Sequence, residues 1–250
     1  MKAMSKFWMA LVVGVSIVGM LAFTSTPVYS ASLTRVDISW ETFIANYADI
    51  DSPVVPGLFE AFDFDPETEG GDGEIYSQVF KGKGTYAGYY VYVYQIDHFY
   101  TSSSAELDEM SFKFLVPNSP PIGNSYFNIT SITSGEPTIG FGELGDQPAY
   151  LGEFNLPNEI GFKFEGSYWD SEENEWKWDG GLTKNETSNI FGFIHPLPPS
   201  TVVPNLVDAG PDLLKPRVYT PSPEPSTIAL LGMGLLGIVG IGRRRYRRVK

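Results

Sequence analysis

The sequence predicts an all-β fold, an antiparallel β-sandwich of the jelly-roll type, over residues 31–197. In this region short runs of aromatic and β-branched residues alternate with clusters of Gly, Pro, Asn and Ser, and aromatic residues make up 14% of the chain. No segment of it keeps a helical spacing of apolar residues over several turns. The chain has no cysteine, so packing and hydrogen bonds must stabilise the fold without disulfides.

The clearest strand is 89–96, where tyrosines alternate with valines after a glycine-rich stretch at 81–88. Such a run suits a central strand that is buried on at least one face. One helical turn is expected at 40–47, before the first of these strands. Further strands are expected at 74–80, 111–116, 126–132, 138–141, 159–164 and 190–194.

Residues 168–181 predict a β-hairpin that carries three of the five tryptophans. Its turn would lie at 171–174, and Trp169 and Trp176 would pair across it. Five acidic residues fall within the same stretch. Because indole rings can stack on sugar rings while carboxylates bind the hydroxyls, Trp169, Trp176 and Trp178 are candidate glycan-binding residues. The alternative is that the tryptophans serve only to stabilise the hairpin.

Residues 31–222 are strongly acidic, with nine basic and 29 acidic residues and a net charge of −20. Binding to phosphate groups needs clustered Lys and Arg. The composition therefore excludes nucleic acid as a partner, and it leaves cations, cationic surfaces and neutral glycans open.

Residues 1–30 have the pattern of a signal peptide. Lys2 and Lys6 precede an apolar run from 7 to 23, and a turn-prone stretch follows. The small residues before Ala31 predict that signal peptidase cleaves between Ser30 and Ala31, so that the rest of the chain is exported. The alternative is an uncleaved amino-terminal anchor.

Residues 198–222 are rich in proline and predict an extended linker without regular strand pairing. The following segment 227–242 contains 16 residues without a charge, which predicts one short transmembrane helix. Such a helix spans about 24 Å, less than a hydrocarbon core of about 30 Å. Snorkelling of Arg243 and Arg244 can cover the deficit, and the basic residues 243–250 would hold this end in the cytoplasm.

The tail 223–250 has three parts in order: a Pro-Glu-Pro-Ser motif, the glycine-punctuated apolar span and a basic end. Its motif residues are Pro223, Glu224, Pro225 and Ser226, and its membrane-flanking basic residues are Arg243, Arg244 and Arg245. This arrangement resembles the PEP-CTERM sorting signal. The alternative is a simple tail anchor that is never processed.

The resemblance implies recognition by an exosortase, a multipass membrane protease that cleaves near the Pro-Glu-Pro motif. It also implies a Gram-negative bacterium that makes exopolysaccharide and a biofilm matrix. The protein would be exported through the inner membrane to the cell envelope, the outer surface or the extracellular matrix. Its tail would stay in the cytoplasm until processing.

An acidic segment follows position 62 and invites calcium, because carboxylates on a turning loop are typical calcium ligands. The candidate ligands are Asp63, Asp65 and Glu67. The EF-hand pattern fails, however, since no glycine stands at its sixth position. The alternative is a solvated acidic loop that binds no metal, and we expect no other cofactor.

The residues offer few means of catalysis. The chain has two histidines, His98 and His195, and no recognised nucleophile or metal-protease motif. We therefore expect a non-enzymatic protein of the cell surface or extracellular matrix, with a structural, adhesive or polysaccharide-interacting role in a biofilm. The alternatives are a carbohydrate-active enzyme with an unrecognised pair of carboxylates and a calcium-dependent glycan-binding module.

Overall fold

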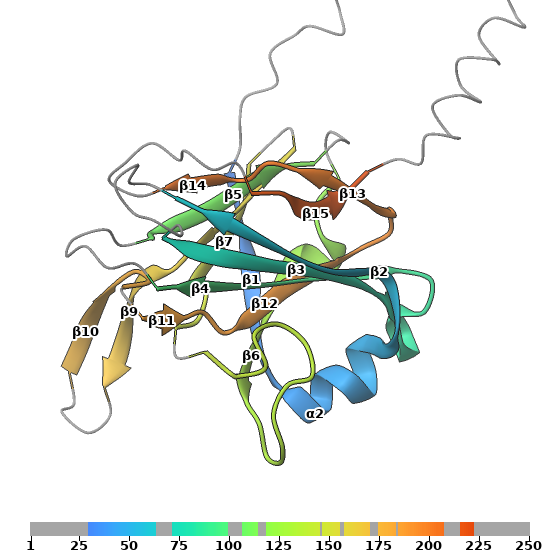
Figure 1. Cartoon of the computed structure of the whole chain (residues 1–250), viewed down its shortest axis with the longest axis horizontal. Helices are drawn as coiled ribbons and strands as arrows, with labels where there is room; N and C mark the ends of the chain where they lie inside the picture. The colour runs from blue at the N-terminus through green and yellow to red at the C-terminus, as the bar shows by residue number, and fades with distance from the viewer. Residues whose placement is uncertain are drawn as a thin grey trace, which may run out of the picture.

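Strands dominate the structure, a computed structural model, as the short aromatic runs of the sequence predict (Figure 1). The all-β prediction is therefore confirmed. The structure describes residues 30–63, 72–99, 107–114, 119–145, 147–155, 158–170, 175–183, 185–207 and 216–222.

Within these residues, eleven strands form one mixed sheet in the order β14-β5-β8-β7-β1-β6-β12-β4-β3-β2, with β11 paired to β4. They are β1 (Ser30–Ser39), β2 (Ala48–Phe62), β3 (Gly73–Gly82), β4 (Tyr90–His98), β5 (Glu109–Lys113), β6 (Ser125–Ser131), β7 (Leu151–Asn155), β8 (Glu159–Lys163), β11 (Glu186–Thr187), β12 (Ile190–His195) and β14 (Asn205–Val207). Two separate ribbons pair β9 (Glu165–Asp170) with β10 (Glu175–Gly180), and β13 (Pro199–Val202) with β15 (Val218–Pro221). The helical elements are α2 (Trp40–Thr42), the π-helical turn η1 (Phe43–Tyr47) and the 3-10 turns η2 (Gly84–Tyr86) and η3 (Ile122–Asn124).

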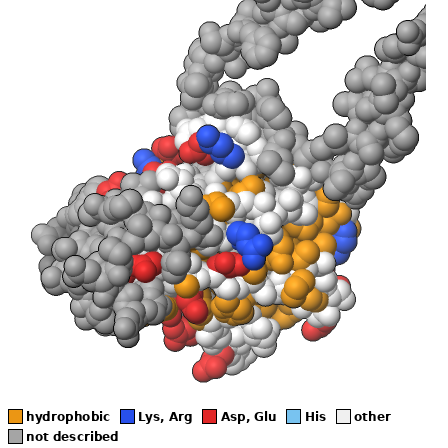
Figure 2. All heavy atoms as spheres, turned by 45° about the horizontal axis from the view of Figure 1, so that its top comes forward, with side chains coloured by type: hydrophobic (Ala, Val, Ile, Leu, Met, Phe, Trp, Pro, Cys, Tyr) orange, Lys and Arg blue, Asp and Glu red, His pale blue; other side chains and the backbone are white. Residues whose placement is uncertain are grey.

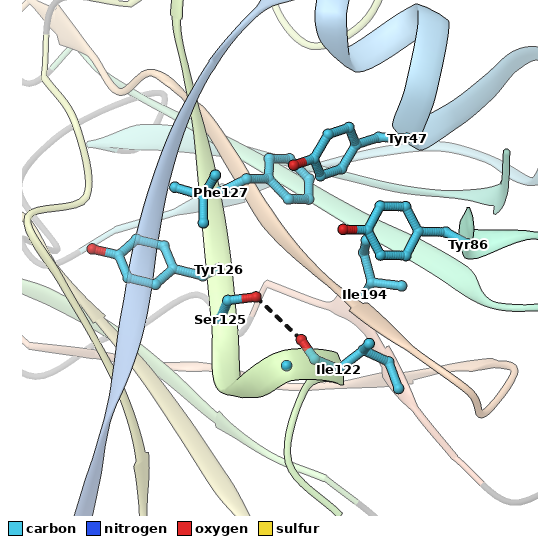
Figure 3. A pocket seen from close by; sticks show the side chains of 9 residues that line it. Tyr47, Tyr86, Ile122, Ser125, Tyr126, Phe127 and Ile194 are labelled. Carbon is cyan, nitrogen blue, oxygen red and sulfur yellow. Dashed lines mark hydrogen bonds between the residues drawn. The ribbon is translucent and has the colours of Figure 1, made fainter. Parts of the chain in front are cut away.

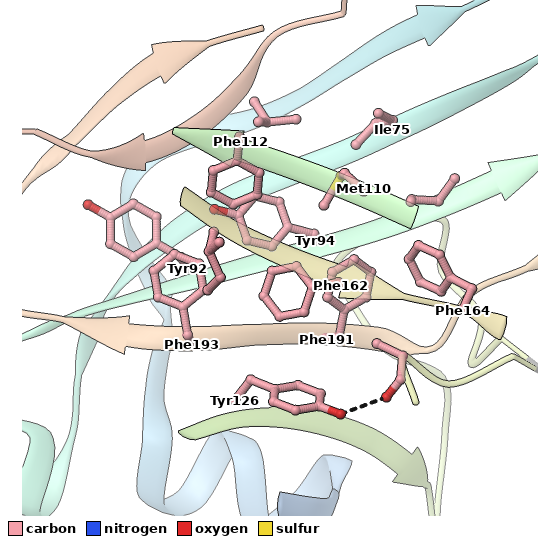
Figure 4. Close-up of a cluster of buried hydrophobic side chains, with 14 of the residues drawn as sticks. Ile75, Tyr92, Tyr94, Met110, Phe112, Tyr126, Phe162, Phe164, Phe191 and Phe193 are labelled. Atoms are coloured by element: carbon pink, nitrogen blue, oxygen red, sulfur yellow. Dashed lines mark hydrogen bonds between the residues drawn. The ribbon is translucent and has the colours of Figure 1, made fainter. Parts of the chain in front are cut away.

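The sheet curls so that its two halves enclose an aromatic core (Figure 4). Tyr94 on β4 shows the closure, since its ring lies 5.3 Å from that of Phe112 on β5 and 5.8 Å from that of Phe191 on β12. Because side chains alternate across a strand, Tyr92 and Tyr94 enter this core while Val91 faces the opposite way. Strand β4 is consequently buried on both faces, which explains its run of apolar and aromatic residues.

A second apolar cluster covers the outer face of the half-sheet that contains β4. Ser39 caps the helix α2, since its hydroxyl accepts a hydrogen bond from the Thr42 amide at 3.1 Å. Trp40 of α2 and Phe43 of η1 lie on this face, with their rings stacked 5.6 Å apart. The helical turn predicted at 40–47 is confirmed by α2 and η1.

One strand pairing departs from the antiparallel prediction. Strands β1 and β6 run parallel, with Thr34 opposite Ser125 and Ile38 opposite Ile129, while β1 pairs antiparallel with β7 on its other edge. The two halves of the expected sandwich are thus joined through β1 into one continuous mixed sheet. The alternation of apolar residues could not indicate this, because it specifies which face of a strand is buried and not the direction of its neighbour.

The strand predicted at 138–141 is wrong. This segment forms a turn, in which Gly140 has a φ of +69° that favours glycine. Ile139 packs into the second cluster, and the Phe141 amide donates a hydrogen bond of 2.9 Å to Gln95 Oε1. Apolar side chains here anchor a loop to the sheet, and that role gives the same short apolar pattern as a strand.

The linker predicted for 198–222 is also wrong over its described residues. Strand β14 pairs with β5, and β13 pairs with β15. The prolines are tolerated because Pro199 and Pro221 face each other at the end of a separate two-stranded ribbon. Val218 is fully buried in the main core, so the folded body extends to Ser222 and not to 197.

Candidate functional site

The predicted tryptophan hairpin is present as the ribbon of β9 and β10, which projects from one end of the body (Figure 1). Trp169 is directly opposite Trp176, as the sequence predicts, and Trp178 is opposite Ser167. Opposed residues share a face of a ribbon, and so do residues two apart on one strand. The three tryptophan positions therefore fall on one face, whereas Tyr168 and Lys177 fall on the other.

The first residues of β9 pack against the rest of the protein at Tyr150. A Cβ at Gly166 would lie 2.6 Å from the Tyr150 ring, so glycine is needed where β9 passes this side chain. At the other end, Gly181 has a φ of +106°, and the chain then pairs Leu182 with Leu107. The ribbon thus leaves the body at a defined place beside two buried leucines.

His195 contacts the hydroxyl group of Ser119. Its Nε2 lies 3.0 Å from both Oγ and the backbone oxygen of Ser119. The Leu197 amide donates a hydrogen bond of 3.2 Å to Nδ1, so Nδ1 must be unprotonated and Nε2 must carry the proton. His195 is therefore a donor toward Ser119 and cannot accept its hydroxyl proton, which is what a serine nucleophile would require. Burial lowers the pKa of His195 to about 4.

His98 is fully buried beside the Phe62 ring, with the two ring centroids 6.1 Å apart. Its Nδ1 donates to the Leu182 backbone oxygen at 2.9 Å. Among the described residues its Nε2 has no hydrogen-bond partner. The His98 ring in this position contributes to the packing where β4 meets the base of the hairpin.

Of the predicted calcium ligands, Asp63 follows directly after β2, while Asp65 and Glu67 lie outside the described residues. In the part of the chain that the structure describes, no three His, Asp or Glu side chains are grouped to hold a metal ion.

A pocket of about 100 Å³ opens beside η1, η2 and the start of β6 (Figure 3). Tyr47 and Tyr86 reach it from the two helical turns, Ser125 and Phe127 from β6, and Ile194 from β12. The sequence does not predict this site, because its residues come from separate segments that only the folded sheet brings together. The sequence offers one signal, the closely spaced glycines at 82 and 84 that shape the turn before Tyr86.

The body ends at a fixed point. The Ser222 amide donates a hydrogen bond of 2.9 Å to the Pro198 oxygen, and Thr220 is fully buried. At the other end, β1 begins at Ser30, with Ala31 opposite Phe154. The predicted signal peptide lies outside the described residues, apart from Ser30 at its end, and the tail 223–250 lies outside them entirely.

Residues 223–248 match the family model of the PEP-CTERM protein-sorting motif. The chain carries a PEP-CTERM motif. This match confirms the resemblance seen in Pro223, Glu224, Pro225 and the basic end. The motif implies a secreted protein that is targeted to the cell envelope and processed by an exosortase, a membrane protein.

No curated protein and no solved structure matches the chain. The PEP-CTERM motif begins one residue after Ser222, where the folded body ends. No helix in the described segments is long and apolar enough to cross a bilayer. The span predicted at 227–242 lies outside these segments.

Proposed function

We propose that the folded body is a non-enzymatic protein of the cell surface or extracellular matrix, which binds polysaccharide in the biofilm of a Gram-negative bacterium. The PEP-CTERM motif supports delivery to the envelope. Signal peptidase removes residues 1–30, the segment 227–242 spans the inner membrane, and an exosortase acts near the Pro-Glu-Pro motif.

One observation carries the binding part of the proposal. The register of β9 and β10 assigns Trp169, Trp176 and Trp178 to the same face of a projecting ribbon. Three aromatic positions grouped on one face, two of them opposite each other and the third two residues further along β10, suit binding of sugar rings, since an indole can stack on a ring. A hairpin that needed aromatic residues only for its own stability would be served by the opposed pair alone.

The charge of the body supports a neutral polysaccharide over an anionic one. The net charge between residues 31 and 222 is −20, which repels anionic chains. On the face that Figure 2 shows, the basic side chains stand apart from one another, whereas phosphate or sulfate groups need several together.

The test is sedimentation of the full-length protein with insoluble matrix polysaccharide from a producing strain. The triple variant Trp169→Ala, Trp176→Ala, Trp178→Ala is expected to lose at least tenfold in affinity, because stacking contacts with aromatic rings contribute about 0.5–1.5 kcal/mol each. The matched control is Tyr168→Ala with Lys177→Ala, which changes the opposite face of the same ribbon and should leave binding within about twofold.

The same experiment separates the alternatives. Saturable binding without release of reducing sugar supports the proposal, and steady release of sugar would establish a carbohydrate-active enzyme instead. Binding that disappears with a calcium chelator would assign the segment after Asp63 to a calcium-dependent glycan site. Equal loss in the triple variant and the control would show that the tryptophan face is not the binding surface.

A further inference from the structure

The pocket beside η1 and η2 has a lining of unusual composition for a surface pocket of this acidic protein. Its nine lining residues include no charged side chain. Tyr47, Tyr86 and Ser125 bring hydroxyl groups among apolar side chains, whereas the Tyr126 hydroxyl donates to the Ala149 backbone oxygen in the main core. Figure 3 shows that the hydroxyl ends of Tyr47 and Tyr86 point the same way, toward the space above Ser125. The pocket therefore offers neutral hydroxyl groups over an apolar floor.

Contacts between separate elements hold the pocket in shape. The Lys83 amide donates to the Tyr47 backbone oxygen at 3.0 Å, and the Lys83 ammonium donates to the Ile44 backbone oxygen at 3.1 Å. A Cβ at Gly82 would lie 2.2 Å from the Tyr86 backbone oxygen, so the tight turn before Tyr86 requires glycine there. Because these contacts do not involve the pocket lining's hydroxyls, the pocket is formed before any ligand arrives.

The aromatic rings are packed against each other and do not surround a void. The Tyr47 ring lies 5.2 Å from that of Tyr86 and 5.7 Å from that of Phe127, measured between centroids. A quaternary ammonium group needs aromatic faces on several sides of it, and rings this close leave no space between them. Anions are disfavoured as well, since the lining supplies no Lys or Arg.

The hydroxyl groups are placed to exchange hydrogen bonds with a polyhydroxyl ligand. Burial and the neighbouring Tyr86 hydroxyl, which is also its hydrogen-bond partner, raise the pKa of Tyr47, so the Tyr47 hydroxyl keeps its proton at physiological pH. A hydroxyl can donate once and accept twice, so the linked pair keeps acceptor sites for a ligand. Ser125 uses its proton on the Ile122 oxygen at 3.1 Å and retains acceptor capacity.

We propose that this pocket binds one neutral hexose residue, at the end or at a branch of a polysaccharide. Its volume of about 100 Å³ is below the range of about 300–1,000 Å³ typical of larger ligand sites, so it accepts part of one ring and no more. Val36 and Ile194 would contact the apolar face of the sugar, while the hydroxyls of Tyr47 and Tyr86 would bind its hydroxyls. The choice of a polysaccharide rests on the proposed function, although the pocket is a separate site from the tryptophan face.

The experiment is saturation-transfer difference NMR on the full chain in mild detergent, with methyl glycosides of glucose, galactose, mannose and N-acetylglucosamine as probes. At least one is expected to bind in the millimolar range. Val36→Phe, which fills the pocket, should weaken binding more than tenfold. Tyr86→Phe, which removes one hydroxyl, should weaken it about two- to tenfold. The matched control is Tyr89→Phe, a half-buried tyrosine that does not line the pocket.

The outcomes separate this inference from the proposed function. Hexose binding that persists unchanged in Val36→Phe and Tyr86→Phe overturns the pocket, even if the tryptophan face binds polysaccharide. Hexose binding that these variants abolish supports the pocket, even if the full chain fails to sediment with matrix polysaccharide. Stronger signals from tetramethylammonium or methyl glucuronide than from every neutral hexose would show that the ligand class is wrong.

Discussion

At the scale of single residues, burial keeps His195 neutral by lowering its pKa, although the hydrogen bond to Ser119 acts in the opposite direction, and contacts at both ring nitrogens fix its tautomer. The Leu197 amide occupies Nδ1, and Ser119 surrounds Nε2. Protonation of Nδ1 would break the bond from Leu197 and place a charge in an apolar setting, where the Phe114 ring lies 5.3 Å away. The sequence marks His195 as one of two histidines available for catalysis, but the tautomer that removes it from that role follows only from its partners in the fold.

This environment predicts that stability falls in acid through His195. Its pKa is about 4 in the folded protein and about 6.5 when unfolded. Between these values the unfolded chain binds more protons, so stability is complete above about pH 6.5 and decreases as the pH falls toward 4. The loss is up to about 3 kcal/mol.

Urea unfolding at a series of pH values measures this effect. The variant His195→Gln is expected to be less stable at neutral pH but to lack this part of the pH dependence. Subtracting the two profiles cancels the titration of the many carboxylates. A difference that stays constant between pH 6.5 and 4 would mean that His195 has the same pKa in the folded and unfolded states.

At the scale of elements, the strands that the sequence predicts correctly include β3, β4, β5, β6, β8 and β12. Strands β3, β4 and β12 are interior strands of the sheet, and their composition follows from burial on both faces. The edge strand β2 escaped prediction because it combines exposed positions with three irregularities in its pairing to β3, near Pro53 and Val55. Strands β13 to β15 escaped it because proline suggested a linker, whereas the ribbon accepts proline where no donor is needed. The pocket was not predictable, since its residues meet only through the β1–β6 and β6–β12 pairings.

Strand β15 is predicted to be essential to the body. Val218 is fully buried, and the Tyr219 oxygen accepts a hydrogen bond of 2.6 Å from the Tyr94 hydroxyl at the centre of the core. A chain that ends at Ser222 should unfold cooperatively. One that ends at Arg217 should lose about 3 kcal/mol or more, from the exposed apolar surface and from the buried hydroxyl left without its acceptor. Chemical unfolding of the two truncated chains provides the measurement, and equal midpoints would show that β15 is an accessory ribbon.

At the scale of the whole molecule, the folded body and the PEP-CTERM motif are contiguous. Ser222 is hydrogen-bonded to Pro198, and the motif begins at Pro223. A protease that acts on an extended segment cannot reach the bonds of β15 without first pulling Val218 and Thr220 out of the body. Folding of the body therefore sets an amino-terminal limit to processing.

This limit predicts the carboxyl end of the processed protein. Intact-mass measurement of the cell-surface form should give a chain that retains every residue from Ala31 through Ser222 and lacks the basic end from Arg243 onward. A chain that still carries residues 243–250 in cells with an active exosortase would contradict the sorting role of the motif. As a control, Val218→Asp should destabilise the packing of β15. It should yield less surface protein, with carboxyl ends at several positions upstream of Ser222, because proteases act on the opened state. If this variant instead gives the same end and the same amount, the position of the cut is set by the motif alone and not by the fold that precedes it.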